Sequence, residues 1–204
     1  MVELYKSVDN LNIRVIMTPM EAGNMKILFD NNEIITIAKR IGQEIAHDYE
    51  GTNPIIVCVL NGAKPFHSEL LKHVNIPYEV DALRAKSYDG SESTGSVEIL
   101  KDLSLDIEGR NVILIEDIID TGHTMSKLIP MLKKRNPLSI RVATMLDKKC
   151  RRKVDFEADY VGATIPNHFV IGFGLDFDGK FRELPYIGIY DESVNETNTT
   201  SSIE

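Results

Sequence analysis

The spacing of apolar residues divides the chain into segments of two kinds. Between Asn32 and Tyr49 apolar residues recur every three or four positions, which is the period of an amphipathic helix. Asp30 and Glu33 match a capping box at the start of this segment. We therefore predict a helix over residues 32–49.

Strand patterns and two further helical patterns follow along the chain. Apolar runs that favour strands occur at residues 55–60, 76–82, 97–100, 112–115 and 140–146. A helix is predicted with Pro65 in its first turn. Another is predicted over residues 124–134, where Pro130 would kink the helix or delay its start.

Strands that alternate with helices predict the fold class α/β, with a doubly wound, mostly parallel sheet. We expect a single domain over residues 1–190, with its core at about 31–150 and a disordered polar tail at 191–204. The segments 1–30 and 150–190 fall outside the alternation, so we expect them to pack together as a small hood lobe.

Three loops are expected at the ligand-binding edge of this sheet. Ligands of doubly wound sheets bind beyond the carboxyl ends of the strands. The loops that the pattern places there are 61–64, 86–95 and 117–124. The second is long and rich in Ser and Gly, and loops this long in compact domains tend to be either functional lids or disordered.

Composition narrows the class of protein. The 204 residues are 43% hydrophobic and 26% charged, as in a globular domain. The net charge of −8 argues against a broad nucleic-acid or membrane surface, but leaves room for a local basic pocket. No apolar window is long enough to span a membrane, and two cysteines form no disulfide framework, so a cytoplasmic location is expected.

The segment VILIEDIIDTGHTM combines a buried strand with three acids. Glu116 and Asp117 end the apolar run, and Asp120 precedes a small-residue loop at the start of a helix. Backbone N–H groups at a helix start favour phosphate, whereas carboxylates accept hydrogen bonds from neutral hydroxyls. A sugar phosphate such as ribose 5-phosphate would satisfy both. The alternative is that Asp117 and Asp120 only cap the following helix.

The same segment carries a resemblance to a known family. EDIIDTGHT resembles the phosphoribosyl-pyrophosphate signature of type I phosphoribosyltransferases. LNGAKPF, KSYDGSESTG, MLDKK and VGATIPNHFVIGFGLDFDGKFREL are similar, in the same order, to successive motifs of hypoxanthine-guanine phosphoribosyltransferases. The resemblance covers roughly residues 12–190 and implies the type I phosphoribosyltransferase fold.

The resemblance also implies a reaction. In that family 5-phosphoribosyl moves from phosphoribosyl pyrophosphate to nitrogen 9 of hypoxanthine or guanine, giving IMP or GMP and pyrophosphate in purine salvage. Magnesium is the implied cofactor. The implied assembly is a homodimer or homotetramer, and neither nucleic acid nor a membrane is an expected partner.

Residue roles carried over from the family fall into five groups. The ribose 5-phosphate site is implied at Glu116, Asp117, Asp120, Thr121, Gly122, His123 and Thr124, with Asp120 as the catalytic base. The purine site is implied at Lys148, Phe169, Val170 and Asp176. Pyrophosphate is assigned to Asn61, Gly62, Arg152 and Arg182, with Arg151 as a rival of Arg152. The lid begins with Ser87 and Tyr88, and magnesium is assigned to Glu116, Asp117 and Asp176.

Without the family, several of these residues have plainer interpretations. Lys148 would be a solvated lysine in a basic run, and Phe169 a core residue of a strand. Isolated arginines would be surface charges. The family also implies a non-proline cis peptide at Leu60–Asn61, which the sequence by itself does not suggest.

Three positions depart from the family pattern, and they leave the preferred purine base undecided. Asn61, His123 and His168 stand where many members carry a basic residue or lysine. The preference among hypoxanthine, guanine and xanthine is therefore undecided, and a xanthine-preferring relative is an alternative. A regulator that binds nucleic acid is another, but it predicts a basic face and loss of the base, whereas this acidic chain keeps Asp120.

Overall fold

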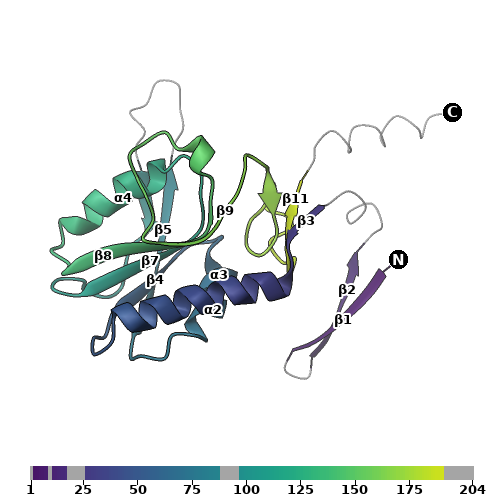
Figure 1. Cartoon of the computed structure of the whole chain (residues 1–204), viewed down its shortest axis with the longest axis horizontal. Helices are drawn as coiled ribbons and strands as arrows, with labels where there is room; N and C mark the ends of the chain where they lie inside the picture. Colours follow the sequence, from purple (N-terminus) through teal and green to yellow (C-terminus); the bar gives the residue numbers. More distant parts are fainter. Residues whose placement is uncertain (1, 9–10, 18–25, 88–96, 191–204) are drawn as a thin grey trace.

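A computed structural model describes residues 2–8, 11–17, 26–87 and 97–190 (Figure 1). In chain order the elements are β1 (Val2–Val8), β2 (Leu11–Met17), β3 (Lys26–Phe29), α2 (Asn31–Asp48), β4 (Ile55–Val59), α3 (Lys64–Leu71), β5 (Glu79–Ser87), β6 (Val97–Lys101), β7 (Asn111–Ile119), α4 (His123–Lys133), β8 (Ser139–Asp147), the 3-10 helix η1 (Lys149–Arg151), β9 (Tyr160–Thr164), β10 (Val170–Ile171) and β11 (Ile187–Ile189).

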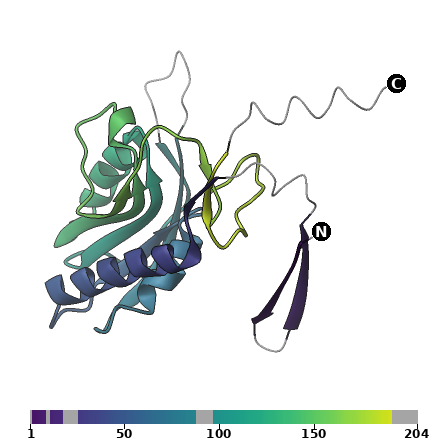
Figure 2. The same ribbon diagram turned by 45° about the vertical axis from the view of Figure 1, so that its right-hand side comes forward.

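The central sheet has six strands in the order β6-β5-β4-β7-β8-β9. All neighbours are parallel except β6, which pairs antiparallel with β5 at one edge. In Figures 1 and 2, α2 and α3 cover one face of this sheet and α4 covers the other. The predicted doubly wound, mostly parallel α/β architecture is confirmed.

Alternation along β7 shows how the sequence fills two cores. Ile113 and Ile115 pack into the cluster on the side of α2 and α3. Val112 and Leu114 pack into the cluster on the side of α4. Successive side chains of a strand point to opposite faces, so a continuous apolar run is what a strand covered on both faces requires.

The start of α2 is fixed by its own sequence. The Asp30 carboxylate accepts from the Glu33 N–H at 2.9 Å, and the Glu33 carboxylate accepts from the Asp30 N–H at 2.9 Å. This is the predicted capping box, and it satisfies donors that a helix start leaves free.

Two strand boundaries and one helix start differ from the predictions. The strand predicted at 76–82 runs instead from Glu79 to Ser87, because its first backbone bond is from Glu79 N–H to the Pro54 carbonyl and Pro77 offers no N–H. The β7 strand does not end at residue 115 but continues through the acids to residue 119.

The helix that follows β7 also differs from its prediction. α4 begins at His123, so Pro130 lies inside the helix and does not delay its start.

The hood forms in part from the expected segments. β10, β11 and β3 make a three-stranded antiparallel sheet, which joins residues 26–29 to residues 170–189. Figure 2 shows this sheet beside the central one. The expected core boundary near residue 150 is wrong, because β9 pairs with β8 in the central sheet. β1 and β2 pair with each other as a separate hairpin, and the expected tail at 191–204 lies outside the described residues.

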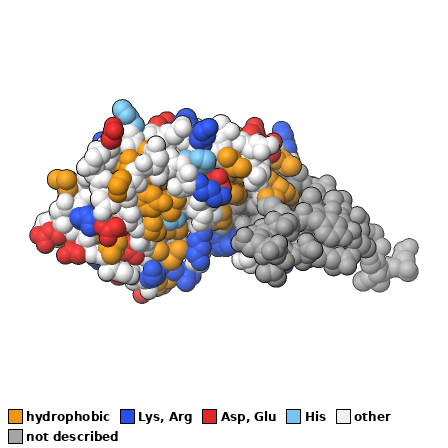
Figure 3. Space-filling view, turned by 90° about the horizontal axis from the view of Figure 1, so that it is seen from below, with side chains coloured by type: hydrophobic (Ala, Val, Ile, Leu, Met, Phe, Trp, Pro, Cys, Tyr) orange, Lys and Arg blue, Asp and Glu red, His pale blue; other side chains and the backbone are white. Residues whose placement is uncertain are grey.

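The surface carries both signs of charge. Figure 3 views the molecule from below Figure 1, and basic and acidic side chains are scattered there among apolar ones. Within the described ranges, no helix has both the length and the apolar character needed to cross a membrane.

Candidate active site

The carboxyl ends of β4, β7 and β8 meet at one edge of the sheet, and the loops that leave them form the site. The loop between β7 and α4 and the first two residues of α4, residues 120–124 in all, are here called the phosphate loop, after the ligand that the sequence predicts for them. Gly122 has φ of +83° and serves as the N-cap of α4. A Cβ at this position would lie 2.9 Å from both Arg152 Cδ and Val154 Cγ2, so only glycine fits.

Two pockets open beside the phosphate loop. The first, called the loop pocket, has a volume of about 220 Å³. Its lining includes Glu116, Asp120, Thr121, Gly122 and Thr124. The second, called the aromatic pocket, has a volume of about 250 Å³. It is lined by Asp117, Ile118, Asp120, Lys148, Phe169, Val170, Leu175 and Asp176. Asp120 and Ile118 line both.

The two adjacent acids of β7 face different pockets. Glu116 lines the loop pocket and Asp117 the aromatic pocket. The pairing of β7 with β8 is regular up to Glu116, skips Asp117 and resumes at Ile118. Beyond this point the alternation reverses, since Ile118 packs on the side of α2 and Ile119 on the side of α4. Because successive side chains of a strand point to opposite faces, Glu116 and Asp117 reach two different pockets from the end of one strand.

Burial raises the pKa of Glu116 well above its ordinary value, and the nearby Asp117 carboxylate raises it further. A carboxyl with a raised pKa can become a charged acceptor when a hydroxyl or a cation approaches it. The arrangement therefore suits a ligand with neutral donors beside the phosphate loop.

Asp117 lies against the loop that follows β4. Its Oδ1 accepts the Ile118 N–H at 2.8 Å. A Cβ on Gly62 would lie 1.6 Å from Asp117 Oδ2, and a Cβ on Gly174 would lie 1.9 Å from the Gly62 carbonyl oxygen. Three segments therefore meet with no room for side chains. The peptide bond between Leu60 and Asn61 is cis, as the family resemblance implies.

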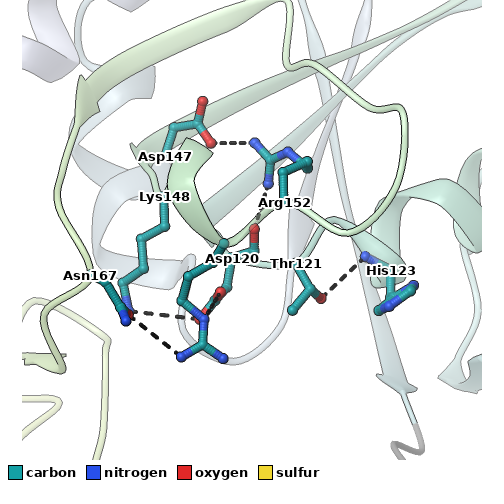
Figure 4. Close-up of polar contacts among 8 residues, drawn as sticks. Asp120, Thr121, His123, Asp147, Lys148, Arg152 and Asn167 are labelled. Carbon is teal, nitrogen blue, oxygen red and sulfur yellow. Dashed lines mark hydrogen bonds and ion pairs between the residues drawn. The ribbon is translucent and has the colours of Figure 1, made fainter.

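Asp120 lies between the two cations Lys148 and Arg151, and Figure 4 shows it beside Lys148. Lys148 Nζ is 3.7 Å from Asp120 Oδ2, and its side chain is only 8% exposed. Arg151 Nε is 2.8 Å from Asp120 Oδ1, and its Nη1 donates to Asn167 Oδ1 at 3.5 Å. Lysine side chains are seldom buried unless they are paired with an acid, and Lys148 is paired with Asp120. Lys148 is therefore not the solvated lysine of a surface run.

Arg152 contacts the backbone of the phosphate loop. Its Nη1 donates to the Asp120 carbonyl at 2.6 Å, and its Nη2 donates to the Asp147 carboxylate (Figure 4). Asp147 is fully buried, and Arg152 is 11% exposed. The guanidinium that was assigned to pyrophosphate is thus bound within the protein, and Arg152 is absent from the linings of both pockets.

An aromatic group closes one side of the aromatic pocket. Phe169 is 48% exposed and meets Phe177 edge to face, with ring centroids 5.6 Å apart. Phe177 stacks on Tyr190 at 4.8 Å. The exposed face of Phe169 offers a flat ring to a planar ligand, which argues against its interpretation as a core residue. Val170 beside it is buried in β10.

Asp176 and Arg182 form an ion pair at the rim of the aromatic pocket. Arg182 Nη2 lies 2.7 Å from Asp176 Oδ1, and Arg182 Nη1 donates to the Gly174 carbonyl at 2.5 Å. Asp176 Oδ2 accepts the Gly179 N–H at 2.8 Å. These contacts hold an acid and a cation next to the aromatic pocket.

Most of the predicted site residues meet at this edge, and some do not. Asn61 is exposed next to buried Gly62, while Ser87 is the last residue of β5. Tyr88 and the rest of the predicted lid lie outside the described residues. Among the described residues, no group of three or more His, Cys, Asp or Glu side chains lies close enough together to hold a metal ion.

Sequence reasoning missed Asp147, Leu175 and Asn167. Asp147 ends the buried run VATMLD, just as the acids of β7 end theirs. An acid at the end of a strand that is buried on both faces needs a partner, and that signal could have identified it.

A comparison with protein families agrees with this geometry. Residues 24–178 match the family model described as phosphoribosyl transferase domain. This range includes both acids of β7, the phosphate loop and Asp176. The chain belongs to the phosphoribosyltransferase family.

Named relatives narrow the comparison. The chain is 49% identical over 176 residues to a hypoxanthine-guanine phosphoribosyltransferase of Streptococcus thermophilus, with 86% of the chain and 98% of the relative covered. A solved hypoxanthine phosphoribosyltransferase of Staphylococcus aureus is 39% identical, with a TM-score of 0.83 and coverage of 88% of the chain and 98% of that structure. One from Trypanosoma cruzi, in a ternary substrates complex, is 40% identical with a TM-score of 0.78, covering 83% and 97%. These relatives place the chain among the hypoxanthine-guanine phosphoribosyltransferases.

Proposed function

We propose that the protein transfers 5-phosphoribosyl from phosphoribosyl pyrophosphate to nitrogen 9 of hypoxanthine or guanine, giving IMP or GMP and pyrophosphate. The observation that carries this proposal is the position of Asp120, which lines both the loop pocket and the aromatic pocket. A sugar phosphate in the first and a planar base in the second would meet beside its carboxylate. The relatives named for this activity support it.

The base would bind in the aromatic pocket. Phe169 would stack on the purine ring, and Val170 would offer its backbone to the purine edge. Lys148, held 3.7 Å from Asp120, would donate to the 6-oxygen. An ammonium has three donors and no acceptor, so this contact favours 6-oxopurines over 6-aminopurines.

The ribose phosphate would bind at the loop pocket. Backbone N–H groups of residues 121–124 and the start of α4 provide donors for the 5-phosphate. Glu116 and Asp117 would accept from the ribose hydroxyls. Asp120 would then accept a proton from the purine ring as nitrogen 9 attacks the sugar, a contribution of about 10²–10⁴-fold in rate.

Pyrophosphate would leave on the side of Gly62 and Arg182. Asn61 and Gly62 would contribute backbone groups, and Arg182 would contribute its guanidinium to the departing negative charge. Ser87 and Tyr88 would begin a lid that excludes water from the activated sugar.

Magnesium is part of this proposal, and the residues present fit it. Asp117 and Asp176 line the same pocket. Mg²⁺ commonly takes one or two carboxylates and completes its shell with water and substrate phosphates, so a full protein cage is not required. When bound there, the ion would neutralise charge on pyrophosphate. Glu116 lines the other pocket and would act on the ribose side.

The test is nucleotide formation by the purified protein. It would be incubated with phosphoribosyl pyrophosphate, magnesium and hypoxanthine, guanine, xanthine or adenine separately. We expect product with hypoxanthine or guanine and none with adenine, and a large loss in Asp120→Asn. Asp102→Asn, which removes the charge of a surface pair with Arg135, is the matched control and should keep full activity. Product with xanthine alone would replace the proposed substrate, and product with no base would refute the enzyme.

The assembly and the location follow the family and stay predictions. We expect a homodimer or homotetramer, which light scattering would measure directly, and a cytoplasmic location.

A further inference from the structure

We infer that Arg152 is a positioning residue that orients the phosphate-binding N–H groups of the phosphate loop, with Asp147 as its anchor. The inference rests on the proposed function, because the proposed substrate carries the phosphate that the loop would bind. It assigns Arg152 a part other than contact with pyrophosphate.

Two carbonyl groups of the phosphate loop are held from one side. Arg152 Nη1 donates to the Asp120 carbonyl at 2.6 Å. The next residue of the same segment, Lys153, donates its backbone N–H to the Thr121 carbonyl at 3.0 Å. Both donors come from the segment that links β8 to β9, so consecutive peptide planes of the loop are fixed by a single partner.

Fixing these carbonyls also fixes two donors. In a trans peptide the carbonyl and the following N–H point in opposite directions. The bond to the Asp120 carbonyl therefore turns the Thr121 N–H away from Arg152, and the bond to the Thr121 carbonyl does the same for the Gly122 N–H. Two neighbouring N–H groups are thus directed to the side opposite the β8–β9 segment. Such a pair next to a glycine with positive φ is an anion-binding arrangement.

The arginine is itself held in place. Its second terminal nitrogen donates to Asp147, which is fully buried at the end of β8. Within the described residues the other oxygen of Asp147 has no hydrogen-bond partner, so Arg152 is the cation that binds this carboxylate directly. The stem of Arg152 packs on Gly122, where a Cβ would lie 2.9 Å from its Cδ. Anchor, guanidinium and loop therefore form one continuous set of contacts.

An arginine is needed because it makes two contacts at once. The planar guanidinium reaches the Asp147 carboxylate with one nitrogen and the Asp120 carbonyl with the other. A lysine would keep the positive charge beside Asp147 but offers a single ammonium in place of the fork. Arg152→Lys therefore separates charge compensation from loop orientation.

The test compares ligands with and without a phosphate. For wild type and Arg152→Lys, calorimetry would measure the dissociation constants of GMP and guanosine, and steady-state assays would measure KM for phosphoribosyl pyrophosphate and for hypoxanthine. We expect Arg152→Lys to weaken GMP and raise the KM for phosphoribosyl pyrophosphate by roughly 10- to 100-fold, the worth of a charged hydrogen bond. Guanosine binding and the KM for hypoxanthine should stay within about threefold.

Two further variants make the result decisive. Arg141 lies on β8, as Asp147 does, and forms an exposed ion pair with Asp159. Arg141→Lys should leave the dissociation constants and both KM values unchanged. Asp147→Asn keeps an acceptor for Arg152 but loses the charge, so it should weaken GMP in the same direction. Combined with Arg152→Lys it should add little, because both act through one contact.

Two outcomes would overturn the inference. One is an unchanged affinity for GMP in both Arg152→Lys and Asp147→Asn. The other is an equal loss for the two ligands, which would indicate general damage to the fold. Should Arg152→Lys not fold, Asp147→Asn carries the same comparison. The proposed function fails separately, if wild type forms no nucleotide, since the binding ratio is measured without turnover.

Discussion

Gly62→Ala tests whether the position of Asp117 sets the rate of the reaction. The new Cβ would lie 1.6 Å from Asp117 Oδ2, whereas real Cβ atoms essentially never approach closer than 3.0 Å, so the two atoms must move apart by at least 1.4 Å, and the Asp117 carboxylate is the more flexible partner. A misplacement of about 1 Å at a reacting centre costs on the order of 10²-fold in rate, or about 2.7 kcal/mol. The fold should lose only about 1 kcal/mol, because one hydrogen bond, from the Ile118 N–H to Asp117 Oδ1, is disturbed.

The assay is kcat/KM for phosphoribosyl pyrophosphate with saturating hypoxanthine, together with Tm. Gly51→Ala is the matched control, since Gly51 has φ of +73° and nothing within 4 Å of the added Cβ. Backbone strain should cost that variant roughly 1–2 kcal/mol of stability and leave kcat/KM unchanged. A Gly62→Ala enzyme within about threefold of wild type would refute the placement of Asp117 at the ribose.

Three other changes test the site and the fold. Glu116→Gln should raise Tm at neutral pH. Folding raises the pKa of Glu116, so above about pH 4.5 the folded protein binds more protons than the unfolded chain. The stability of the wild type therefore falls as pH rises, whereas Gln cannot ionise. The gain should vanish below pH 4.5, and a gain equal at all pH values would contradict this cause. Burial raises the pKa of the Cys58 thiol to about 11, so the native protein should release one equivalent in a disulfide-exchange assay, from exposed Cys150, and two after denaturation. Asp30→Ala should cost about 1 kcal/mol and lower Tm by about 3 °C through loss of the cap to Glu33, and an unchanged Tm would show that the cap contributes nothing.

Local patterns predicted the elements whose signals are complete in sequence. The α2 helix has its period and its capping box within about 20 residues, and the β7 strand has an apolar run that buries both faces. The predicted boundaries were wrong where pairing with a neighbouring strand sets the extent of an element. β5 extends through Arg84 and Lys86 because these residues pair with β6. β9 joins the central sheet because it pairs with the outer edge of β8.

The same distinction holds for the site. Asp120, Lys148 and Phe169 were predicted through family motifs, and the structure brings them to one pocket. Arg152 was assigned to pyrophosphate because the sequence gives the charge of an arginine but not its partner. Its partner Asp147 lies five residues away, yet the pair depends on how η1 turns the chain between them.

The order in which the hood strands occur along the chain has a consequence for synthesis. β3 is made before the central sheet, and β11, with which it pairs, is made after it, some 160 residues later. Domains generally fold as the ribosome releases them from the N-terminus, so the sheet can form while β3 still lacks its neighbour. Phe169 and Val170 reach their final place only when β11 closes the hood between them and β3. A nascent chain would therefore acquire its purine site last, and a messenger truncated before residue 187 would yield a protein with an intact sheet and no place for the base.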